Sequence, residues 1–227
     1  MKVLGLPFMF RNKEHAFDVL DGPIGTGLLE EGSQYWLRGL GYYDAGSRSF
    51  YTKEKPVRQP ADLNGQKIRV MESVTAMDMV RNLGGSPTPI SWGELYTSLQ
   101  QGVVDGAENN PPSFYLSKHY EVCKYYSLDE HTMLPDVLVM SQHTWDNLTE
   151  KQQSWVLGSV KESVKYQRVL WDEAEKEALA EVQKAGVEII RPDKSPFQNK
   201  VRSMLESYES DPAMADLINK IQQVKSE

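Results

Sequence analysis

Short apolar runs alternate with amphipathic segments through the middle of the chain. The runs predict strands at Lys67–Val70, Thr88–Ile90, Val103–Gly106 and Pro135–Ser141. The segments between them have helical spacing of apolar residues and predict helices at Val74–Leu83, Trp92–Gln101 and from Pro111 to about Val122. Strands that alternate with helices over short loops are typical of a parallel, doubly wound α/β sheet.

Local signals mark the ends of the helices. The pair Gly84-Gly85 follows one of them, where glycine can adopt the left-handed conformation that ends a helix. Two segments match the capping box, in which two side chains satisfy each other's backbone donors, Ser91–Glu94 and Thr149–Gln152. The second box opens a predicted helix at Glu150–Ala185, about 54 Å long at about 1.5 Å per residue. A helix of that length exceeds one small lobe and is expected to lie across two.

The two ends of the chain have weaker patterns. Residues 1–60 are rich in loops, with a predicted helix at Glu30–Leu40 and a predicted strand at Gly39–Ala45. The apolar stretch within the first eleven residues is too short for a signal peptide. These residues are predicted to form a buried strand and turn. Toward the C-terminus we expect a strand and then two helices, at Val187–Ile190, Pro196–Tyr208 and Pro212–Val224.

Composition excludes several classes of function. The 227 residues suffice for one large domain or two lobes of about 100 residues each. The net charge of -7, without a dense basic run, argues against nucleic-acid binding. Cys123 is the only cysteine, which excludes an intramolecular disulfide and a cysteine-based metal site. No run of eighteen apolar residues predicts a membrane span.

Signals for catalysis and for cofactors are equally weak. There is no Gly-x-Ser-x-Gly elbow, and the four histidines do not have the spacing of a metal site. Asp105 and Glu108 could form an acid/base pair, but a strand-to-turn junction gives them no defined geometry. Asp105 is better explained as a residue that holds the turn at Gly106. We therefore expect no metal and no cofactor.

Polar residues cluster where predicted strands end. Arg69 closes one strand, and the next strand leads into Glu108, Asn109 and Asn110. Ligands of open α/β sheets bind outside the carboxyl ends of the strands, and an arginine there can hold a carboxylate through two parallel hydrogen bonds. Arg48, in a loop after a strand, is either a second anchor or a structural ion pair.

Other residues of this region leave two interpretations open. Trp92 is either a core residue or a flat apolar wall for a ligand. Asn109 either orients a ligand or caps the following helix. The residues by themselves favour a carrier of a small organic acid and leave a small α/β enzyme as the alternative.

One set of motifs carries a specific resemblance. The motifs are Leu63-x-Gly-x-Lys-Ile-Arg-Val, Gly84-Gly-x-Pro-x-Pro, and Ser91-Trp-Gly-Glu-Leu-Tyr-x-x-Leu-Gln-Gln-Gly-Val-Val-Asp-Gly-Ala-Glu-Asn. In order and spacing they resemble the solute-binding subunits of tripartite ATP-independent periplasmic (TRAP) transporters, the DctP-like family. The resemblance covers nearly the whole chain. It implies two α/β lobes that close on an organic acid in the periplasm, with membrane permease subunits as partners.

The resemblance also implies roles for individual residues. Arg69 would pair with the ligand carboxylate, and Asn109 would bond the same group or a neighbouring hydroxyl. Trp92 would line the cleft, and Arg48 aligns only loosely with a second arginine. The remaining implied ligand-binding residues are Glu108, Asn110 and His131. The segment from Gly106 to Phe114, followed by His119-Tyr-Glu-Val122, is similar to members that bind uronic or aldonic sugar acids, with a C4-dicarboxylate or a 2-oxo acid as alternatives.

The resemblance implies a division into lobes as well. Residues 1–46 and 135–174 would form the rest of the N-terminal lobe, and residues 47–134 and 175–227 the C-terminal lobe, with the long helix of about 150–185 spanning both. Family members carry a signal peptide and about 80 further residues before the segment that corresponds to Leu6-Pro-Phe8. We therefore expect an incomplete N-terminal lobe, an exposed sheet edge, and weak or absent ligand binding by this exact chain.

Overall fold

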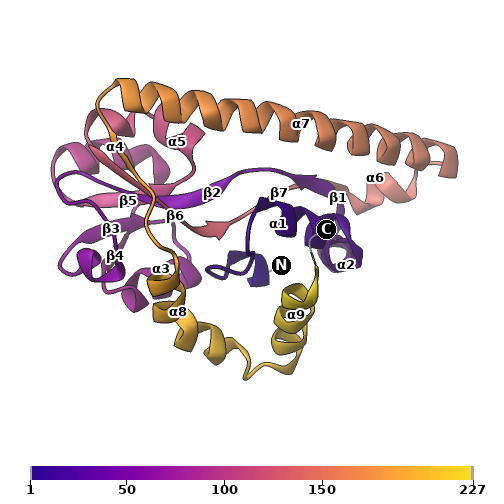
Figure 1. Ribbon diagram of the computed structural model, residues 1–227. Helices are drawn as coiled ribbons and strands as arrows, with labels where there is room; N and C mark the ends of the chain where they lie inside the picture. Colours follow the sequence, from indigo (N-terminus) through magenta and orange to yellow (C-terminus); the bar gives the residue numbers. More distant parts are fainter. Residues whose placement is uncertain (1, 226–227) are drawn as a thin grey trace.

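The computed structural model describes residues 2–225, which fold around two β-sheets (Figure 1). Within this range the larger sheet has six strands, in the spatial order β4 (Ser86–Pro89), β3 (Lys67–Val70), β5 (Gly106–Asn109), β2 (Ser47–Thr52), β6 (Tyr125–Met133) and β8 (Glu188–Ile190). β3 is parallel to β4 and β5, and β6 is parallel to β8. β2 runs antiparallel to both of its neighbours, β5 and β6.

The expectation of an all-parallel sheet is therefore wrong at β2, and the sheet is mixed. The smaller sheet explains why. It pairs β1 (Leu37–Tyr43) with β7 (Asp136–Ser141), and β1 leads directly into β2 while β6 leads directly into β7. The antiparallel pair of β1 and β7 thus continues into the antiparallel pair of β2 and β6 in the larger sheet (Figure 1). Because of this continuity, β2 runs opposite to the other strands of the larger sheet.

One long helix runs alongside both sheets. α7 (Glu150–Lys184) contacts β1 of the smaller sheet, and it contacts α5 (Pro111–Leu116) and β8 beside the larger one. Its predicted boundaries are confirmed to within one residue. Thr149 accepts from the backbone N–H of Gln152 and Gln152 accepts from that of Thr149, so the predicted capping box is also confirmed.

Three hydrophobic clusters cover the faces of the sheets. The first lies between one face of the larger sheet and the helices α3 (Val74–Asn82) and α8 (Ser195–Tyr208). The second lies beneath the opposite face and includes α4 (Trp92–Gln100), α5 and the end of α7. The third joins η1 (Lys2–Gly5), α1 (Lys13–Asp21), α2 (Pro23–Glu30) and α9 (Pro212–Gln223) beside the smaller sheet.

The N-terminal region corrects several predictions. The first residues form the 3-10 turn η1 and not a strand, although Val3, Leu4 and Leu6 are buried as expected. The predicted helix at Glu30–Leu40 is wrong beyond the short 3-10 helix η2 (Glu31–Tyr35), because β1 begins at Leu37. α1, α2 and β2 were not predicted, and neither was β6 farther along the chain.

Corrections in the middle of the chain are smaller. β5 begins at Gly106, three residues later than predicted. The helix expected from Pro111 to Val122 ends at Leu116 and is followed by the separate turn η4 (His119–Glu121). Ser91 precedes α4, but its hydroxyl donates to the carboxylate of Glu94 and neither side chain bonds the backbone of the described residues, so the capping box predicted here is wrong. The remaining short elements are η3 (Pro60–Leu63) and α6 (Gln142–Asp146).

The division into lobes remains a proposal, and packing suggests one change to it. The chain passes between the two sheets at residues 44–46 and 134–135, next to the predicted boundaries. α9 packs with η1 and α2 beside the smaller sheet. We therefore propose that α9 belongs with the first lobe and not with the second.

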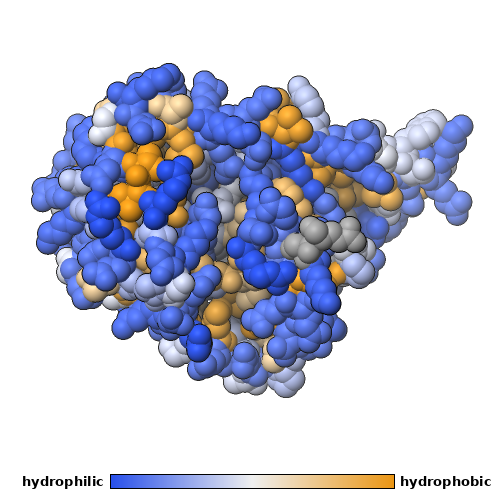
Figure 2. All heavy atoms as spheres, in the orientation of Figure 1, coloured by the Kyte–Doolittle hydropathy of each residue, from blue (hydrophilic) through white to orange (hydrophobic). Residues whose placement is uncertain are grey.

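The surface is mainly hydrophilic, with hydrophobic residues in separate patches, one of them beside α7 (Figure 2). Several large side chains of α7 are exposed, among them Trp155 at 61% and Leu170 at 44%. Within residues 2–225 no helix is long and apolar enough to cross a membrane.

Candidate functional site

Two polar side chains lie together at the carboxyl ends of the neighbouring parallel strands β3 and β5. In the register of these strands Arg69 lies opposite Ala107, two residues before Asn109. Side chains two residues apart in a strand project from the same face, so Arg69 and Asn109 share a face of the sheet. The sequence places both residues at strand ends, and the register puts them on one face, with Asn109 two residues beyond the partner of Arg69.

The guanidinium of Arg69 is buried and only partly bonded. Arg69 is 2% exposed, and its Nε donates to the backbone carbonyl of Ile90 at 2.8 Å. Nη1 is buried without a hydrogen-bond partner among the residues that the structure describes. Burial lowers the pKa of Arg69. A buried guanidinium with an unpaired N–H donor lowers the stability of the protein, and the same donor can bind an anionic ligand.

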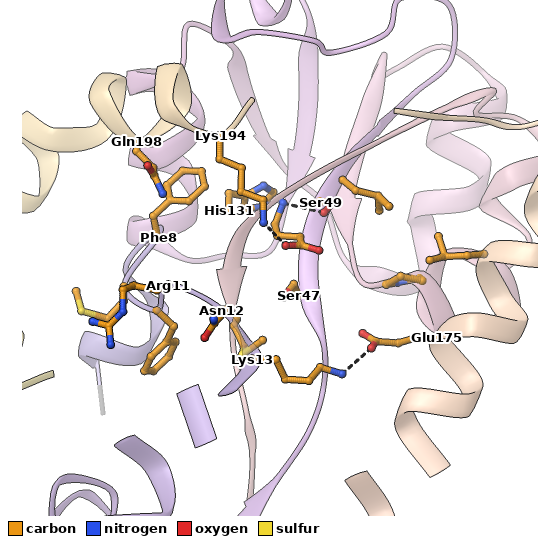
Figure 3. Close-up of a pocket in the computed structure, with 17 residues that line it drawn as sticks. Phe8, Arg11, Asn12, Lys13, Ser47, Ser49, His131, Glu175, Lys194 and Gln198 are labelled. Atoms are coloured by element: carbon orange, nitrogen blue, oxygen red, sulfur yellow. Dashed lines mark hydrogen bonds and ion pairs between the residues drawn. The ribbon is translucent and has the colours of Figure 1, made fainter. Parts of the chain in front are cut away.

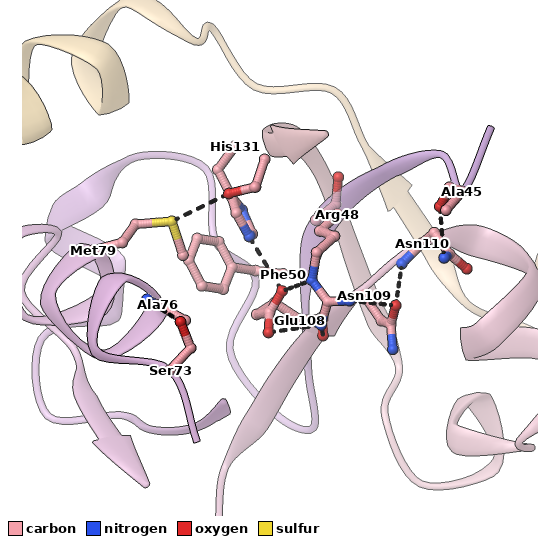
Figure 4. Close-up of polar contacts among 12 residues, drawn as sticks. Ala45, Arg48, Phe50, Ser73, Ala76, Met79, Glu108, Asn109, Asn110 and His131 are labelled. Atoms are coloured by element: carbon pink, nitrogen blue, oxygen red, sulfur yellow. Dashed lines mark hydrogen bonds and ion pairs between the residues drawn. The ribbon is translucent and has the colours of Figure 1, made fainter. Parts of the chain in front are cut away.

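The guanidinium of Arg48, unlike that of Arg69, is hydrogen-bonded at every nitrogen (Figure 4). Its Nε and Nη2 donate to the two carboxylate oxygens of Glu108 at 2.5 and 2.9 Å, and its Nη1 donates to Oδ1 of Asn109 at 3.0 Å. Burial by itself would lower the pKa of Arg48, but the Glu108 carboxylate outweighs burial and raises it. The guanidinium of Arg48 is therefore paired within the protein, whereas that of Arg69 is not.

A buried histidine extends this ion pair. His131 is 0% exposed; its Nε2 lies 3.4 Å from Glu108 and its Nδ1 lies 2.9 Å from Asp129. Burial opposes its protonation, but Asp129 and Glu108 outweigh burial and raise the pKa of His131 to about 9. A bulge around Glu130, which has a positive φ of 50°, turns His131 toward Glu108.

The charges of this network balance. At neutral pH the positive Arg48 and His131 face the negative Glu108 and Asp129, because the pKa of Glu108 is lowered to about 2 as Arg48 and His131 outweigh the effect of burial. Arg69 therefore adds a positive charge that no carboxylate of the described residues offsets by direct contact. The site as a whole favours one negative charge from a ligand.

The two adjacent asparagines face different neighbours. Oδ1 of Asn109 accepts from Arg48 and from the backbone of Asn110, while its Nδ2 makes no hydrogen bond within residues 2–225. Asn110 uses both ends of its amide: Nδ2 donates to the carbonyl of Ala45, and Oδ1 caps α5 by accepting from Ser113. Asn109 thus has a free donor beside Arg69, and Asn110 ties the segment between the sheets to α5.

An aromatic group surrounds Arg69, and part of it was not predicted. The ring of Trp92 lies 5.6 Å from the guanidinium carbon of Arg69 and is 43% exposed. His119 lies 5.1 Å from Trp92, and its Nδ1 is 2.9 Å from the hydroxyl of Tyr51. In the sequence His119 belongs to the motif that resembles sugar-acid-binding members, but no partner was predicted for it, because its contact with Tyr51 joins residues 68 positions apart.

A cavity of about 260 Å³ opens at the same strand ends. Arg48 and Glu108 line it together with Ser73 and Thr75 at the start of α3. The rest of the lining is mainly apolar but includes Lys2 and Thr132. Its volume exceeds that of a few water molecules at about 30 Å³ each. Its lining combines an apolar surface with a few polar groups, which is typical of sites for small ligands.

A second cavity, of about 190 Å³, lies between the N-terminal segment, β2, β6 and α7 (Figure 3). Lys13 reaches toward it and bonds Asp44, Asp172 and Glu175 at 2.8 to 3.0 Å. His131 lines this cavity and also bonds Glu108, which lines the first one. The second cavity is therefore next to the passage between the sheets and not beside Arg69.

The remaining candidates are Asp105 and the possible metal ligands. The carboxylate of Asp105 accepts from the backbone N–H of Lys67, so it joins the segment before β5 to the start of β3. Among the described residues, no group of three or more histidine, cysteine or acidic side chains is placed to hold a metal ion.

Comparisons with known proteins agree with this architecture. The profile described as "Bacterial extracellular solute-binding protein, family 7" matches residues 1–211. The uncharacterized protein YiiZ of Salmonella typhimurium is 39% identical, over 99% of this chain and 69% of its own length.

Two crystal structures are similar over almost the whole chain. A TRAP periplasmic solute-binding protein of Xanthobacter autotrophicus Py2 with bound β-D-galacturonate is 44% identical with a TM-score of 0.92. One of Chromohalobacter salexigens with bound D-glucuronate is 37% identical with a TM-score of 0.95. In each case the match covers 99% of this chain and 75% of the other. The predicted fold class and the predicted class of protein are confirmed, and the chain belongs to family 7 of the bacterial extracellular solute-binding proteins, the solute-binding subunits of TRAP transporters.

Proposed function

We propose that this chain is an extracytoplasmic receptor that captures a hexuronate through its carboxylate and delivers it to the membrane subunits of a TRAP transporter in the periplasm. The galacturonate and glucuronate bound by the two similar proteins support this class of ligand. The local charge at Arg69 also supports a ligand with one carboxylate.

The observation that carries the proposal is the unpaired guanidinium of Arg69. Its Nε is fixed by Ile90 while Nη1 is buried without a partner in the described part of the chain. A ligand carboxylate would supply the missing acceptor and the missing negative charge. The free Nδ2 of Asn109 would donate to the same carboxylate or to a neighbouring hydroxyl.

The other predicted ligand residues receive separate roles in this proposal. Trp92 offers its exposed ring to the sugar, and Glu108 and Arg48 line the cavity where hydroxyl groups would lie. His131 bonds the carboxylate of Glu108 and so orients it. Asn110 bonds the carbonyl of Ala45 and so fixes the segment that joins the sheets.

Capture would proceed by closure of the two lobes about the segments that join the sheets. Contacts made only in the closed state would shift the population toward closure when ligand is bound. No chemical step is part of this proposal. A turnover assay with the bound acid separates a receptor from the alternative of a small enzyme, because a receptor gives stabilisation without product.

Titration of the chain with D-glucuronate and D-galacturonate, followed by two-dimensional NMR, tests the proposal. NMR detects weak binding as well as tight binding, and succinate serves as the dicarboxylate alternative. Arg69→Lys should weaken uronate binding by about 100-fold, because lysine cannot form the bidentate pair and a charge-assisted bond contributes up to about 3 kcal/mol.

The matched control is Arg81→Lys, at an exposed arginine that pairs with Asp78 on α3. This control should bind as the parent does. Equal affinity of the parent and Arg69→Lys would refute the carboxylate anchor, and a preference for succinate would refute the ligand class.

A further inference from the structure

His119 lies behind the exposed part of the Arg69 site. It begins η4 and is 2% exposed, and its ring packs against Trp92 on α4 at 5.1 Å. Trp92 in turn covers the guanidinium of Arg69. Since Trp92 is the first residue of α4 and 43% exposed, its contact with His119 is a main constraint on the orientation of the indole.

A second contact fixes the imidazole itself. Tyr51 is 0% exposed, and its hydroxyl makes its hydrogen bond with Nδ1 of His119 at 2.9 Å. A buried hydroxyl without a partner is unfavourable, so the pair holds both rings in one arrangement. The ring of His119 is therefore held between Tyr51 on β2 and Trp92 on α4.

The charged and titratable groups around His119 keep it neutral. Arg69 faces it from β3, Tyr51 from β2 and Tyr96 from α4, and the hydroxyl of Tyr96 donates to Glu121. Burial, and then the positive charge of Arg69, lower the pKa of His119 to about 4. A neutral imidazole leaves Arg69 as the cation that a ligand carboxylate would meet at this face.

We propose that His119 is a positioning residue of the carboxylate anchor, which holds Trp92 over the guanidinium of Arg69 through its own bond to Tyr51. The proposal rests on the function proposed above, since the anchor is that of a uronate. It predicts that the orientation of Trp92 depends on the ring of His119, and that the imidazole senses the charge at Arg69.

Two sets of variants distinguish the effect of the His119 ring from the effect of its hydrogen bond with Tyr51. His119→Gln retains a partner for Tyr51 but loses the ring beneath Trp92, and D-glucuronate affinity should fall about tenfold, equivalent to about 1.4 kcal/mol. The double variant His119→Phe with Tyr51→Phe restores a ring without an unpaired hydroxyl, and its affinity should return to within about threefold of the parent. His143→Gln, at an exposed histidine of α6, is the control and should bind as the parent does.

NMR provides a readout that a purely structural role would not change. Saturation with glucuronate should raise the pKa of His119 above about 4, because the bound carboxylate offsets the charge of Arg69. An unchanged pKa in the saturated protein, or a glucuronate affinity of His119→Gln equal to that of the control, would overturn the proposal.

Measurements without ligand distinguish this proposal from the proposed function. In the free protein, Arg69→Met should raise the pKa of His119, and His119→Gln should shift the indole N–H signal of Trp92. If the parent binds no uronate but both shifts occur, the proposed function fails and the positioning role stands. If the indole signal of Trp92 does not respond to His119→Gln, the positioning role fails whatever the ligand.

Discussion

Replacing Glu108 by glutamine tests how strongly the buried ion network stabilises the fold. The Glu108 side chain is 2% exposed and accepts two hydrogen bonds from the side chain of Arg48, at 2.5 and 2.9 Å. Glutamine has the same shape but no charge, and its amide nitrogen would face the donors of Arg48. The network of Arg48, His131 and Asp129 would then keep one uncompensated positive charge in the interior.

The magnitude follows from the burial of the pair. Removing one partner of a buried ion pair costs about 3–5 kcal/mol, a large part of a total stability of about 5–15 kcal/mol. Part of the loss depends on pH, because Glu108 helps to raise the pKa of His131 from 6.5 to about 9. Below 6.5 the parent gains the full benefit of the protonated ring, and above about 9 it gains none. The loss in Glu108→Gln should therefore be greater at about pH 6 than above about pH 9.

Urea unfolding followed by circular dichroism, at both pH values, measures this difference. The control is Glu162→Gln, which removes a carboxylate 3.2 Å from Lys165 on the exposed side of α7. A surface pair contributes about 0–1 kcal/mol, so the control should be nearly neutral. A loss below about 1 kcal/mol in Glu108→Gln at both pH values would refute the reasoning, because the buried network would then stabilise no more than a surface pair.

Two further predictions concern the same strands. In the parent, the free energy of unfolding should fall as pH rises from 6.5 to about 9, since His131 loses its proton in the folded state over this range, and His131→Gln should remove that slope in urea titrations. Gly106→Ala should destabilise the protein by about 1–3 kcal/mol, because the new Cβ would lie 2.4 Å from the carbonyl oxygen of Tyr51 in β2. Gly158→Ala on α7, with no atom within 4 Å of the new Cβ, should raise the thermal midpoint instead, and equal midpoints for the two variants would contradict the argument.

Elements with strong local signals were predictable. α7 has a full capping box at Thr149 and Gln152. In β3 charged and apolar residues alternate, and the strand ends before a helix cap at Ser73. These signals depend on residues within a few positions of each other, so periodicity and capping chemistry suffice to read them.

Elements stabilised by distant partners were not predictable. β6 contains Ser127, Asp129 and His131, which resemble a polar loop in sequence. In the fold they are buried and bonded: His131 bonds Asp129 and Glu108, Asp129 accepts from the backbone of β2 at Phe50, and Ser127 accepts from the backbone of Val57. β2 was likewise hidden, because its pairing with β5 and β6 depends on residues about 60 to 80 positions away.

The sequence by itself determined the α/β class, the long helix, and the presence of Arg69 and Asn109 at the ends of strands, since each depends on short-range pattern. Only the tertiary structure decided which arginine has a carboxylate partner among the described residues. The antiparallel insertion of β2 brings Arg48 to Glu108, 60 residues away, and pairs its guanidinium within the protein. The same long-range packing places Tyr51 and His119 beneath Trp92, because contacts between distant side chains depend on the register of the sheet, which no local pattern specifies.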